Sequence, residues 1–421
     1  MDRRQFLKQT GTLALGAAFL THISCTTGKK APSILVVSGW QDVNIGDIAH
    51  TPGLLHILEK SFPESKITLW KKSKSDVVEE LLKKNFPRIE IVHSSVKDKV
   101  IQAEEVLQAV EQADIFIHGS GPSVVATDCL EGWITATDKP FGIFGVTIQD
   151  ISERLKQVLE KASFIFTRET ASIDVLKKKG FTGDHILFAP DATFDLDIWD
   201  DDKALAFMKE NGLEEGKFIC VIPRLRVTPY WKIKKTNHTE EQIREITELN
   251  DRWKEEDHAK ARQAIIAWVR ETGNKVVLCP EMSYQVDIID ELLYDPLPDD
   301  VKPFVVKHGY WLPDEAMSLY SRMHTLLSCE CHSPIMSLRC RRPTFYLRQP
   351  QDTIKGQMYY DLGLADWVFE IEQSTGDQIT ARLMEVAADY EKARQKAAGA
   401  MEIVSDCYGK ATKIVHQTVK G

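Results

Sequence analysis

The sequence has no surplus of positive charge. Its 53 Lys and Arg residues are outnumbered by 62 Asp and Glu residues, which gives a formal net charge of -9 at pH 7. A nucleic-acid-binding protein usually carries a basic stripe that matches the phosphate backbone. The charge balance therefore argues against nucleic acid as a partner and favours sugars or small anions as ligands.

Cysteine is also sparse, with eight residues in a chain of 421. Most of them lie in apolar stretches such as residues 218–222 and 276–279, where a thiol behaves as a small core side chain. A small secreted scaffold built on disulfides would show a denser spacing. The sequence therefore excludes that class of protein.

Long hydrophobic runs are absent, because the longest small-residue apolar stretch, residues 11–21, is too short and too weakly apolar for a comfortable membrane span. This stretch follows the segment Asp2-Arg3-Arg4-Gln5-Phe6-Leu7-Lys8, which resembles the twin-arginine export signal. We therefore predict that residues 1–30 are an export signal and that the protein is exported after it has folded.

Cys25 is a candidate for lipidation. It follows His22, Ile23 and Ser24, which match a lipobox in its last two positions but not in its first. Lipid attachment at Cys25 and ordinary cleavage both remain open. The expected location is periplasmic, either free or as a membrane-anchored lipoprotein that is attached through Cys25 alone.

The rest of the chain has an ordinary globular composition, with 43% hydrophobic and 27% charged residues, and a length that favours two domains. Short apolar runs alternate with amphipathic helical stretches, and because the runs are apolar throughout, they are typical of parallel sheets covered on both faces. The predicted strands are residues 34–37, 67–70, 89–92, 115–117, 141–144, 164–166, 218–222, 275–278, 304–306, 325–327 and 344–346.

This pattern predicts the α/β fold class, with two doubly wound Rossmann-like domains and a central cleft. The expected domains are residues 33–200 and 215–421, and the last helices are expected to pack back on the first domain. A long polar helix is predicted over residues 240–272. The carboxyl ends of the strands should line the cleft.

In the first domain, two glycine-bearing turns and one arginine follow predicted strands. Gly46, in Asn44-Ile45-Gly46-Asp47, permits a ligand to approach the backbone closely or the backbone to adopt a positive φ. The start of the helix that follows offers amide donors to a ligand. A plain turn with Asp47 as the N-cap of that helix is an alternative. The turn Gly119-Ser120-Gly121 follows another predicted strand and lies at the same edge of the predicted sheet as Gly46. The planar guanidinium group of Arg168 can donate two hydrogen bonds to a carboxylate or phosphate, unless Arg168 pairs with Glu169 on the surface.

In the second domain, the segment Cys329-Glu330-Cys331-His332 invites a zinc interpretation with Cys340 as a fourth ligand, or a disulfide to Cys340. The two pairs of closely spaced ligands that are typical of a structural zinc site are absent. Successive side chains of a strand also point to opposite faces, so these residues do not converge on one point. We therefore predict no metal here. Instead, Ser333 as N-cap and Pro334 as first helical residue would start a helix whose positive end faces the cleft.

Read in order, these segments resemble the polysaccharide pyruvyl transferase family over most of the chain. The resemblance implies a fold like that of GT-B glycosyltransferases and transfer of a pyruvyl unit from phosphoenolpyruvate onto two sugar hydroxyls as a ketal, without a cofactor. The segments that carry it are residues 44–47, Gly119-Ser120-Gly121, Arg168-Glu169 with Ser172 and Gly180, 191–194, His332, 342–346, Lys355 and Gly363-Leu364.

The resemblance implies that Arg168 and Lys355 are cations for the donor and that His332 is the acid or base. Arg224, at the exit of residues 218–222, is a weaker cation candidate, and Tyr230, Trp231 and Trp311 are aromatic candidates for a sugar ring. We predict His332, Glu330 and Asp47 as catalytic residues. The predicted substrate-binding residues are Asn44, Gly46, Gly119, Ser120, Gly121, Arg168, Arg224, Glu281, Ser333 and Lys355.

Glu330 departs from the family pattern, which usually has an arginine at this position. A carboxylate reverses the local field for a donor that carries several negative charges. Two further hypotheses therefore stand beside pyruvyl transfer to an envelope or extracellular glycan. One is an exported glycan hydrolase or lyase that uses Glu330 and His332, with Glu281 as a possible second carboxylate; the other is a lipid-anchored glycan-binding protein without transferase chemistry.

Overall fold

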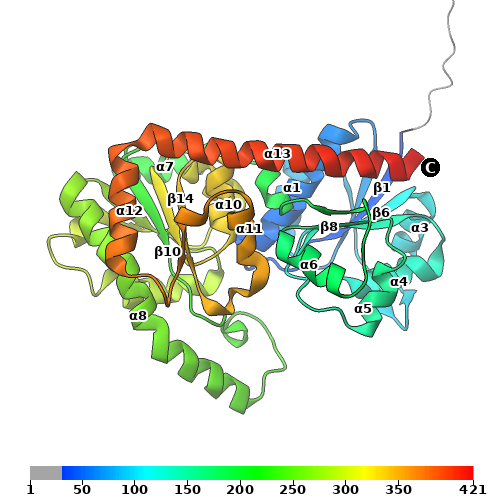
Figure 1. Cartoon of the computed structure of the whole chain (residues 1–421), viewed down its shortest axis with the longest axis horizontal. Helices are drawn as coiled ribbons and strands as arrows, with labels where there is room; N and C mark the ends of the chain where they lie inside the picture. The colour runs from blue at the N-terminus through cyan, green and yellow to red at the C-terminus, as the bar shows by residue number, and fades with distance from the viewer. Residues whose placement is uncertain (1–30, 421) are drawn as a thin grey trace, which may run out of the picture. The chain divides into compact units, whose positions relative to one another are not determined.

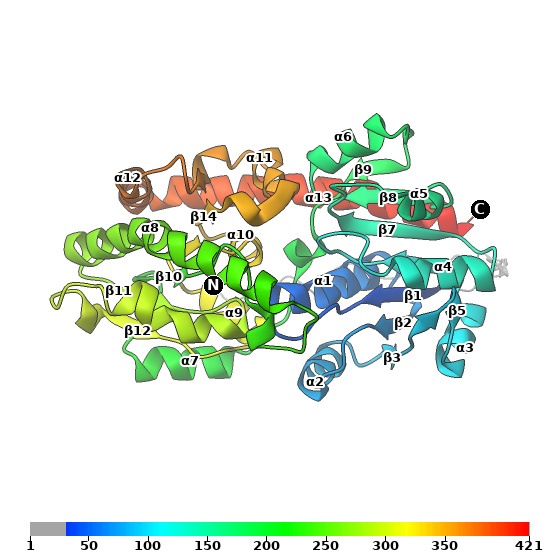
Figure 2. The same cartoon turned by 90° about the horizontal axis from the view of Figure 1, so that it is seen from below.

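The structure is a computed structural model that describes residues 31–420. The predicted export signal and Cys25 lie outside these residues, so both stay predictions. Two parallel sheets follow one another along the chain, and each forms the centre of a lobe with helices on both faces (Figures 1 and 2). This arrangement confirms the predicted α/β class with two doubly wound domains.

The first lobe, called the N-lobe, contains a seven-stranded sheet in the order β3-β2-β1-β6-β7-β8-β9. Its central strand β1 pairs in parallel with both β2 and β6, and nearly all the side chains of these strands are buried. The strands are β1 (Ser33–Ser38), β2 (Lys66–Lys71), β3 (Glu90–Val92), β6 (Ile115–His118), β7 (Phe141–Val146), β8 (Phe164–Thr167) and β9 (Ile186–Phe188), with a hairpin of β4 (Val96–Lys97) and β5 (Val100–Ile101) beside them.

The helices of the N-lobe connect these strands. They are α1 (Ile45–Ser61), α2 (Asp76–Asn85), α3 (Glu104–Gln112), α4 (Thr127–Ala136), α5 (Glu153–Leu159) and α6 (Thr170–Lys178), and they are followed by the 3-10 helix η1 (Ala192–Asp195) and by α7 (Asp201–Glu210).

The second lobe, called the C-lobe, repeats the design with six strands in the order β12-β11-β10-β13-β14-β15. The strands are β10 (Phe218–Ile222), β11 (Lys275–Leu278), β12 (Val305–Lys307), β13 (Thr325–Ser328), β14 (Thr344–Arg348) and β15 (Val368–Glu370). The helices are α8 (Glu240–Thr272), α9 (Pro313–Tyr320), α10 (His332–Arg339), α11 (Gln357–Asp361) and α12 (Gly376–Ala388), with η6 (Pro350–Gly356) before α11.

Helix α13 (Tyr390–Lys420) follows the C-lobe in sequence and lies along both lobes (Figure 1). In the N-lobe, the Tyr408 hydroxyl donates a hydrogen bond of 2.6 Å to the backbone carbonyl of Asp191, and the His416 ring lies 4.0 Å from the ring of Phe62. The helix therefore links the two lobes directly. None of the helices within residues 31–420 combines the length and the apolar character that a membrane span requires.

Two helix starts differ from the prediction by a residue or more. Asn44, not Asp47, is the N-cap of α1, because its Oδ1 accepts hydrogen bonds from the amides of Gly46 at 2.7 Å and Asp47 at 3.2 Å. Cys331, not Ser333, is the N-cap of α10, so His332 is its first helical residue. Helix α1 therefore begins at Ile45, three residues before the start that Asp47 as the N-cap would give.

Gly53 lets α1 pack directly on η1. A Cβ atom at this position would lie 2.1 Å from the backbone carbonyl oxygen of Ala192, which cannot turn aside as a flexible side chain would. Gly53→Ala should therefore destabilise the protein by about 1–3 kcal/mol through overpacking, measured as a lower urea midpoint at unchanged slope.

Gly409 in α13 provides the matched control for this substitution. An added Cβ there would meet nothing within 4 Å. Gly409→Ala should therefore be neutral or stabilising by about 0.5–1 kcal/mol, as expected inside a helix. Equal midpoints for the two variants would contradict the close approach of α1 and η1.

Candidate active site

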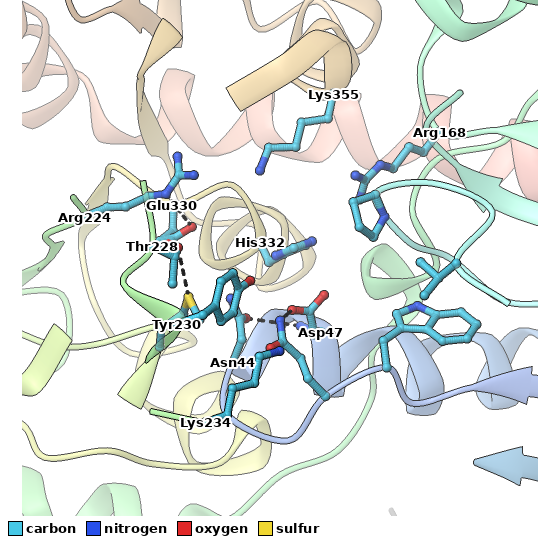
Figure 3. A pocket seen from close by; sticks show the side chains of 15 residues that line it. Asn44, Asp47, Arg168, Arg224, Thr228, Tyr230, Lys234, Glu330, His332 and Lys355 are labelled. Carbon is cyan, nitrogen blue, oxygen red and sulfur yellow. Dashed lines mark hydrogen bonds and ion pairs between the residues drawn. The ribbon is translucent and has the colours of Figure 1, made fainter. Parts of the chain in front are cut away.

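A cavity of about 300 Å³ lies between the two lobes, and its lining comes from both (Figure 3). The lining segments follow β1, β6, β8, β10, β11, β13 and β14, so they lie at the carboxyl ends of parallel strands, as predicted. Seven of the predicted site residues line this cavity: Asn44, Asp47, Arg168, Arg224, Glu330, His332 and Lys355.

The lobes contact each other next to this cavity. The Ile45 amide donates to the Glu281 carbonyl at 2.9 Å, and the Ser283 amide donates to the Val43 carbonyl at 3.0 Å. At Gly46, a Cβ atom would lie 2.3 Å from the Cβ, Cγ and Nδ1 atoms of His332. Gly46 is therefore needed for close approach, but the group that approaches is the His332 side chain of the other lobe.

His332 is held by the buried carboxylate of Glu281, which follows β11. The His332 Nδ1 lies 3.1 Å from Glu281 Oε1, and the Ser333 amide donates to Glu281 Oε2 at 2.6 Å. Burial by itself lowers the pKa of His332, but Cys331 and the Glu281 carboxylate raise it well above its ordinary value. Predicted as substrate-binding residues, Glu281 and Ser333 do not line the cavity; they orient His332 instead.

His50 was not identified from the sequence. This fully buried residue of α1 places its Nε2 3.1 Å from the Nε2 of His332 and 3.2 Å from Oδ2 of Asp191. The available signal was its spacing, because His50 follows Asp47 by three residues and therefore shares a helix face with it. This spacing could be used only with the correct start of α1, because Asp47 and His50 share a helix face only if both are helical.

Arg168 is almost completely buried, which excludes the predicted alternative of a surface pair with Glu169. Its Nη1 donates to Asp191 Oδ2 at 2.8 Å and its Nε donates to Thr147 Oγ1 at 2.7 Å. Burial favours the neutral form of Asp191, but His50 and Arg168 outweigh it and hold the pKa of Asp191 well below its ordinary value. Arg168 thus faces the cavity with part of its charge already balanced.

The carboxylate of Glu330 lies among polar partners of the C-lobe. Gln285 Nε2 donates to Glu330 Oε1 at 2.7 Å, and Arg224 Nε lies 3.4 Å from Glu330 Oε2. Burial raises the pKa of Glu330 to about 7, although the Arg224 guanidinium acts in the opposite direction. A carboxyl group of this kind exchanges its proton close to neutral pH.

Asp352 joins the other two predicted cations. It accepts a hydrogen bond from Arg224 Nη1, and its Oδ1 lies 3.3 Å from Lys355 Nζ. Burial favours the protonated form of Asp352, but Arg224 and Lys355 lower its pKa to about 2. Arg168, Arg224 and Lys355 therefore each have a buried carboxylate partner.

The predicted turn Gly119-Ser120-Gly121 lies beneath the cavity rather than in its lining. Ser120 Oγ accepts from the Ala192 amide at 2.9 Å, and the Ser120 carbonyl accepts from Trp40 Nε1 at 2.6 Å. The turn therefore positions Trp40, which does line the cavity. Of the three aromatic candidates, Tyr230 lines the cavity, Trp231 does not, and Trp311 is buried.

The cysteines beside His332 are free thiols in the described chain, without the disulfide to Cys340 that the sequence left open. Within residues 31–420, Asp47, His50 and His332 form a group whose potential ligand atoms all lie within 4.8 Å of one another. Gln41, Asp191 and the contact between the two imidazoles already supply partners for these atoms. Hydrogen bonding alone accounts for the arrangement.

Known structures share this two-lobed fold at low sequence identity. The UDP-GlcNAc 2-epimerase from Neisseria meningitidis bound to UDP-GlcNAc is 12% identical, with a TM-score of 0.57, over 92% of this chain and 99% of that chain. HepE from Anabaena in complex with UDP-glucose is 11% identical, with a TM-score of 0.55, over 92% and 99% of the two chains. These similarities show a GT-B-like fold.

The sequence itself identifies a family. No curated protein matches the chain significantly. The family model for polysaccharide pyruvyl transferase matches residues 44–349, which are most of the chain and include most of the residues that line the cavity, among them Arg168 and His332. The chain therefore belongs to the polysaccharide pyruvyl transferase family.

Proposed function

We propose that the protein transfers a pyruvyl unit from phosphoenolpyruvate to two hydroxyl groups of a glycan and leaves it there as a ketal. The observation that carries this proposal is the position of His332, which Glu281 holds at the cavity. In the view of Figure 3, Lys355, Arg168 and Arg224 lie above His332, whereas Tyr230 and Asp47 lie below it. Three cations thus lie together on one side of His332, while Tyr230, Asp47 and Lys234 lie on the other side.

The reaction requires one proton at carbon and two hydroxyl attacks. The methylene carbon of the donor takes a proton from His332 and becomes a methyl group, and the first hydroxyl oxygen bonds to the adjacent carbon. The second hydroxyl oxygen then displaces inorganic phosphate from that carbon. One hydroxyl proton returns to His332, and the other is received by Asp47 and leaves with the phosphate.

The cationic side of the cavity suits the donor. Arg168 and Arg224 can each present a planar fork to a carboxylate or a phosphate, and Lys355 adds a point charge. Because these groups are held by Asp191 and Asp352, they need little rearrangement when charge develops on the departing phosphate.

The acceptor in this proposal is an oligosaccharide or polysaccharide of the cell envelope or the extracellular space. Tyr230 can provide a ring face for a sugar, and Asp47 lies near enough to take a hydroxyl proton. This location depends on the export signal that residues 1–30 predict, which is part of the same proposal whether Cys25 carries a lipid or the segment is cleaved in the ordinary way.

Glu330 favours a second candidate function, the hydrolysis of a bond in a glycan. Its pKa of about 7 allows the carboxyl group to give or take a proton near neutral pH beside His332. Hydrolysis needs no phosphorylated donor, so it is compatible with a cavity in which Arg168, Arg224 and Lys355 each already have a carboxylate partner.

The first test replaces the proposed proton donor. His332→Gln should retain binding of phosphoenolpyruvate, seen as a thermal shift, but lower the rate of phosphate release with an oligosaccharide acceptor by about 10²–10⁴-fold, measured by phosphorus NMR. His308→Gln is the matched control, because His308 pairs with Glu315 outside the cavity. Unchanged turnover in His332→Gln would remove His332 from the mechanism.

Glu330→Gln separates the two candidate functions. If the protein is a transferase, removal of a negative charge next to Arg224 should tighten binding of phosphoenolpyruvate by about tenfold, or 1.4 kcal/mol. If Glu330 is the acid of a hydrolase, the same variant should lose cleavage of plain and pyruvylated glycans by at least about 10²-fold. Weaker donor binding together with intact phosphate release would contradict both roles.

The pH dependence of stability tests the state of Glu330. Its pKa is about 7 in the folded protein and about 4.3 in an unfolded chain, so the folded state binds the proton more tightly between these values. Stability should therefore fall as the pH rises through this window, and Glu330→Gln should lack this loss, which is on the order of 2 kcal/mol.

The measurement is the apparent unfolding temperature of both proteins from pH 5 to pH 8. The difference should grow in favour of the variant as the pH rises. Burial also raises the pKa of Glu169 to about 7, but Glu169 is present in both proteins, so its contribution cancels. Parallel curves would show that Glu330 is ionised throughout this range.

A further inference from the structure

His50 and His332 face each other through the same ring atom across the boundary between the lobes. Their Nε2 atoms are 3.1 Å apart, and the two rings meet edge to face, with an interplanar angle of 76°. His50 and its second partner Asp191 belong to the N-lobe, whereas His332 and Glu281 belong to the C-lobe. Four side chains therefore form one continuous chain: Asp191, His50, His332 and Glu281.

The hydrogen positions in this chain are restricted. Glu281 accepts at His332 Nδ1, so that nitrogen carries a hydrogen. The line between the two Nε2 atoms has room for only one hydrogen, because two N–H groups would point at each other over 3.1 Å. When the pair is neutral, this hydrogen belongs to His50, whose Nε2–H has two acceptors, His332 Nε2 and Asp191 Oδ2.

Addition of a proton to His332 changes the positions of the hydrogens on both imidazole rings. If His332 holds hydrogens on both nitrogens, its Nε2–H donates to His50, and the hydrogen of His50 must move to Nδ1. This Nδ1 is buried and has no hydrogen-bond partner among residues 31–420. The acid form of His332 is therefore opposed by an unpaired N–H on His50 and favoured by the carboxylates of Asp191 and Glu281.

We infer that His50 is a positioning residue that controls the proton of His332, so that the two imidazoles take up and release it as one unit. Because Glu281 occupies Nδ1, the proton that His332 gives to a substrate is the one on Nε2, which is the atom that faces His50. The charged or titratable groups around the pair are Asp191, Arg168, Glu281, Cys331 and Asp47.

The contact also makes the proton donor depend on the arrangement of the lobes. The partner of His332 Nδ1 comes from its own lobe, but the partner of Nε2 comes from the other lobe. Separation of the lobes would leave His332 held by Glu281 and release Nε2 from His50. The role of the His50–His332 contact in catalysis rests on the proposed function, in which His332 transfers a proton.

The test is NMR of the imidazole nitrogens in the whole protein, without substrate. In the wild type, the His332 Nε2 signal should titrate in two macroscopic steps, because its proton is shared. In His50→Phe, which keeps a ring of similar size, the same signal should titrate in a single step with the pKa of His332 raised by about one unit, since the opposing N–H is gone.

His50→Gln guards against misfolding of the phenylalanine variant. Its side-chain amide can donate to or accept from His332 Nε2 but cannot take up the proton, so the His332 signal should again titrate in a single step. Identical titration of His332 in all three proteins would overturn the inference. A metal ion that survives dialysis in the wild type and is missing from both variants would overturn it as well, because the nitrogens would then be ligands.

Failure of this inference differs from failure of the proposed function. The NMR titration uses the protein alone, so it gives the same answer whether or not phosphoenolpyruvate binds. Shared titration without donor binding would support the proton pair and reject pyruvyl transfer, whereas independent titration with normal phosphate release would do the reverse.

Discussion

The two hydrogen bonds that the Glu281 carboxylate accepts are the constraint on which the site depends. A buried carboxylate is unfavourable unless its oxygens are satisfied, and here the His332 ring and the Ser333 amide satisfy both. The same residue uses its carbonyl to accept from Ile45 in the other lobe. One residue at the end of β11 thus orients the proton donor, fixes the start of α10 and joins the lobes.

The fold was largely predictable because apolar strand runs carry a strong local pattern. The predicted strands correspond to structural ones, and the helix predicted over 240–272 has these bounds. The edge strands β9 and β15 were missed, since most of their side chains are only partly buried. The site was predictable as far as strand ends dictate it, which brought Arg168, Arg224 and His332 together. Contacts between lobes have no local signature, so the roles of His50 and Glu281 could not be read.

Charge compensation distinguishes this cavity from a simple basic pocket. Arg168, Arg224 and Lys355 line it, but Asp191 and Asp352 pair with them from outside the lining, and Glu330 pairs with Arg224 from within it. Such pairing fixes the geometry of the cations and reduces the net field that a ligand meets. Selection among ligands at this site therefore depends more on the geometry of the available hydrogen bonds than on the net charge of the cavity.

The link that α13 makes between the lobes has a consequence for biosynthesis. The ribosome produces this helix after both sheets, so each lobe can fold while the chain is still attached, but the clasp between Tyr408 and Asp191 forms only once α13 has emerged. Asp191 is also the partner of His50 and Arg168. The hydrogen bond between Tyr408 and Asp191 is therefore added after both sheets have been translated, at the residue whose side chain contacts His50 and Arg168.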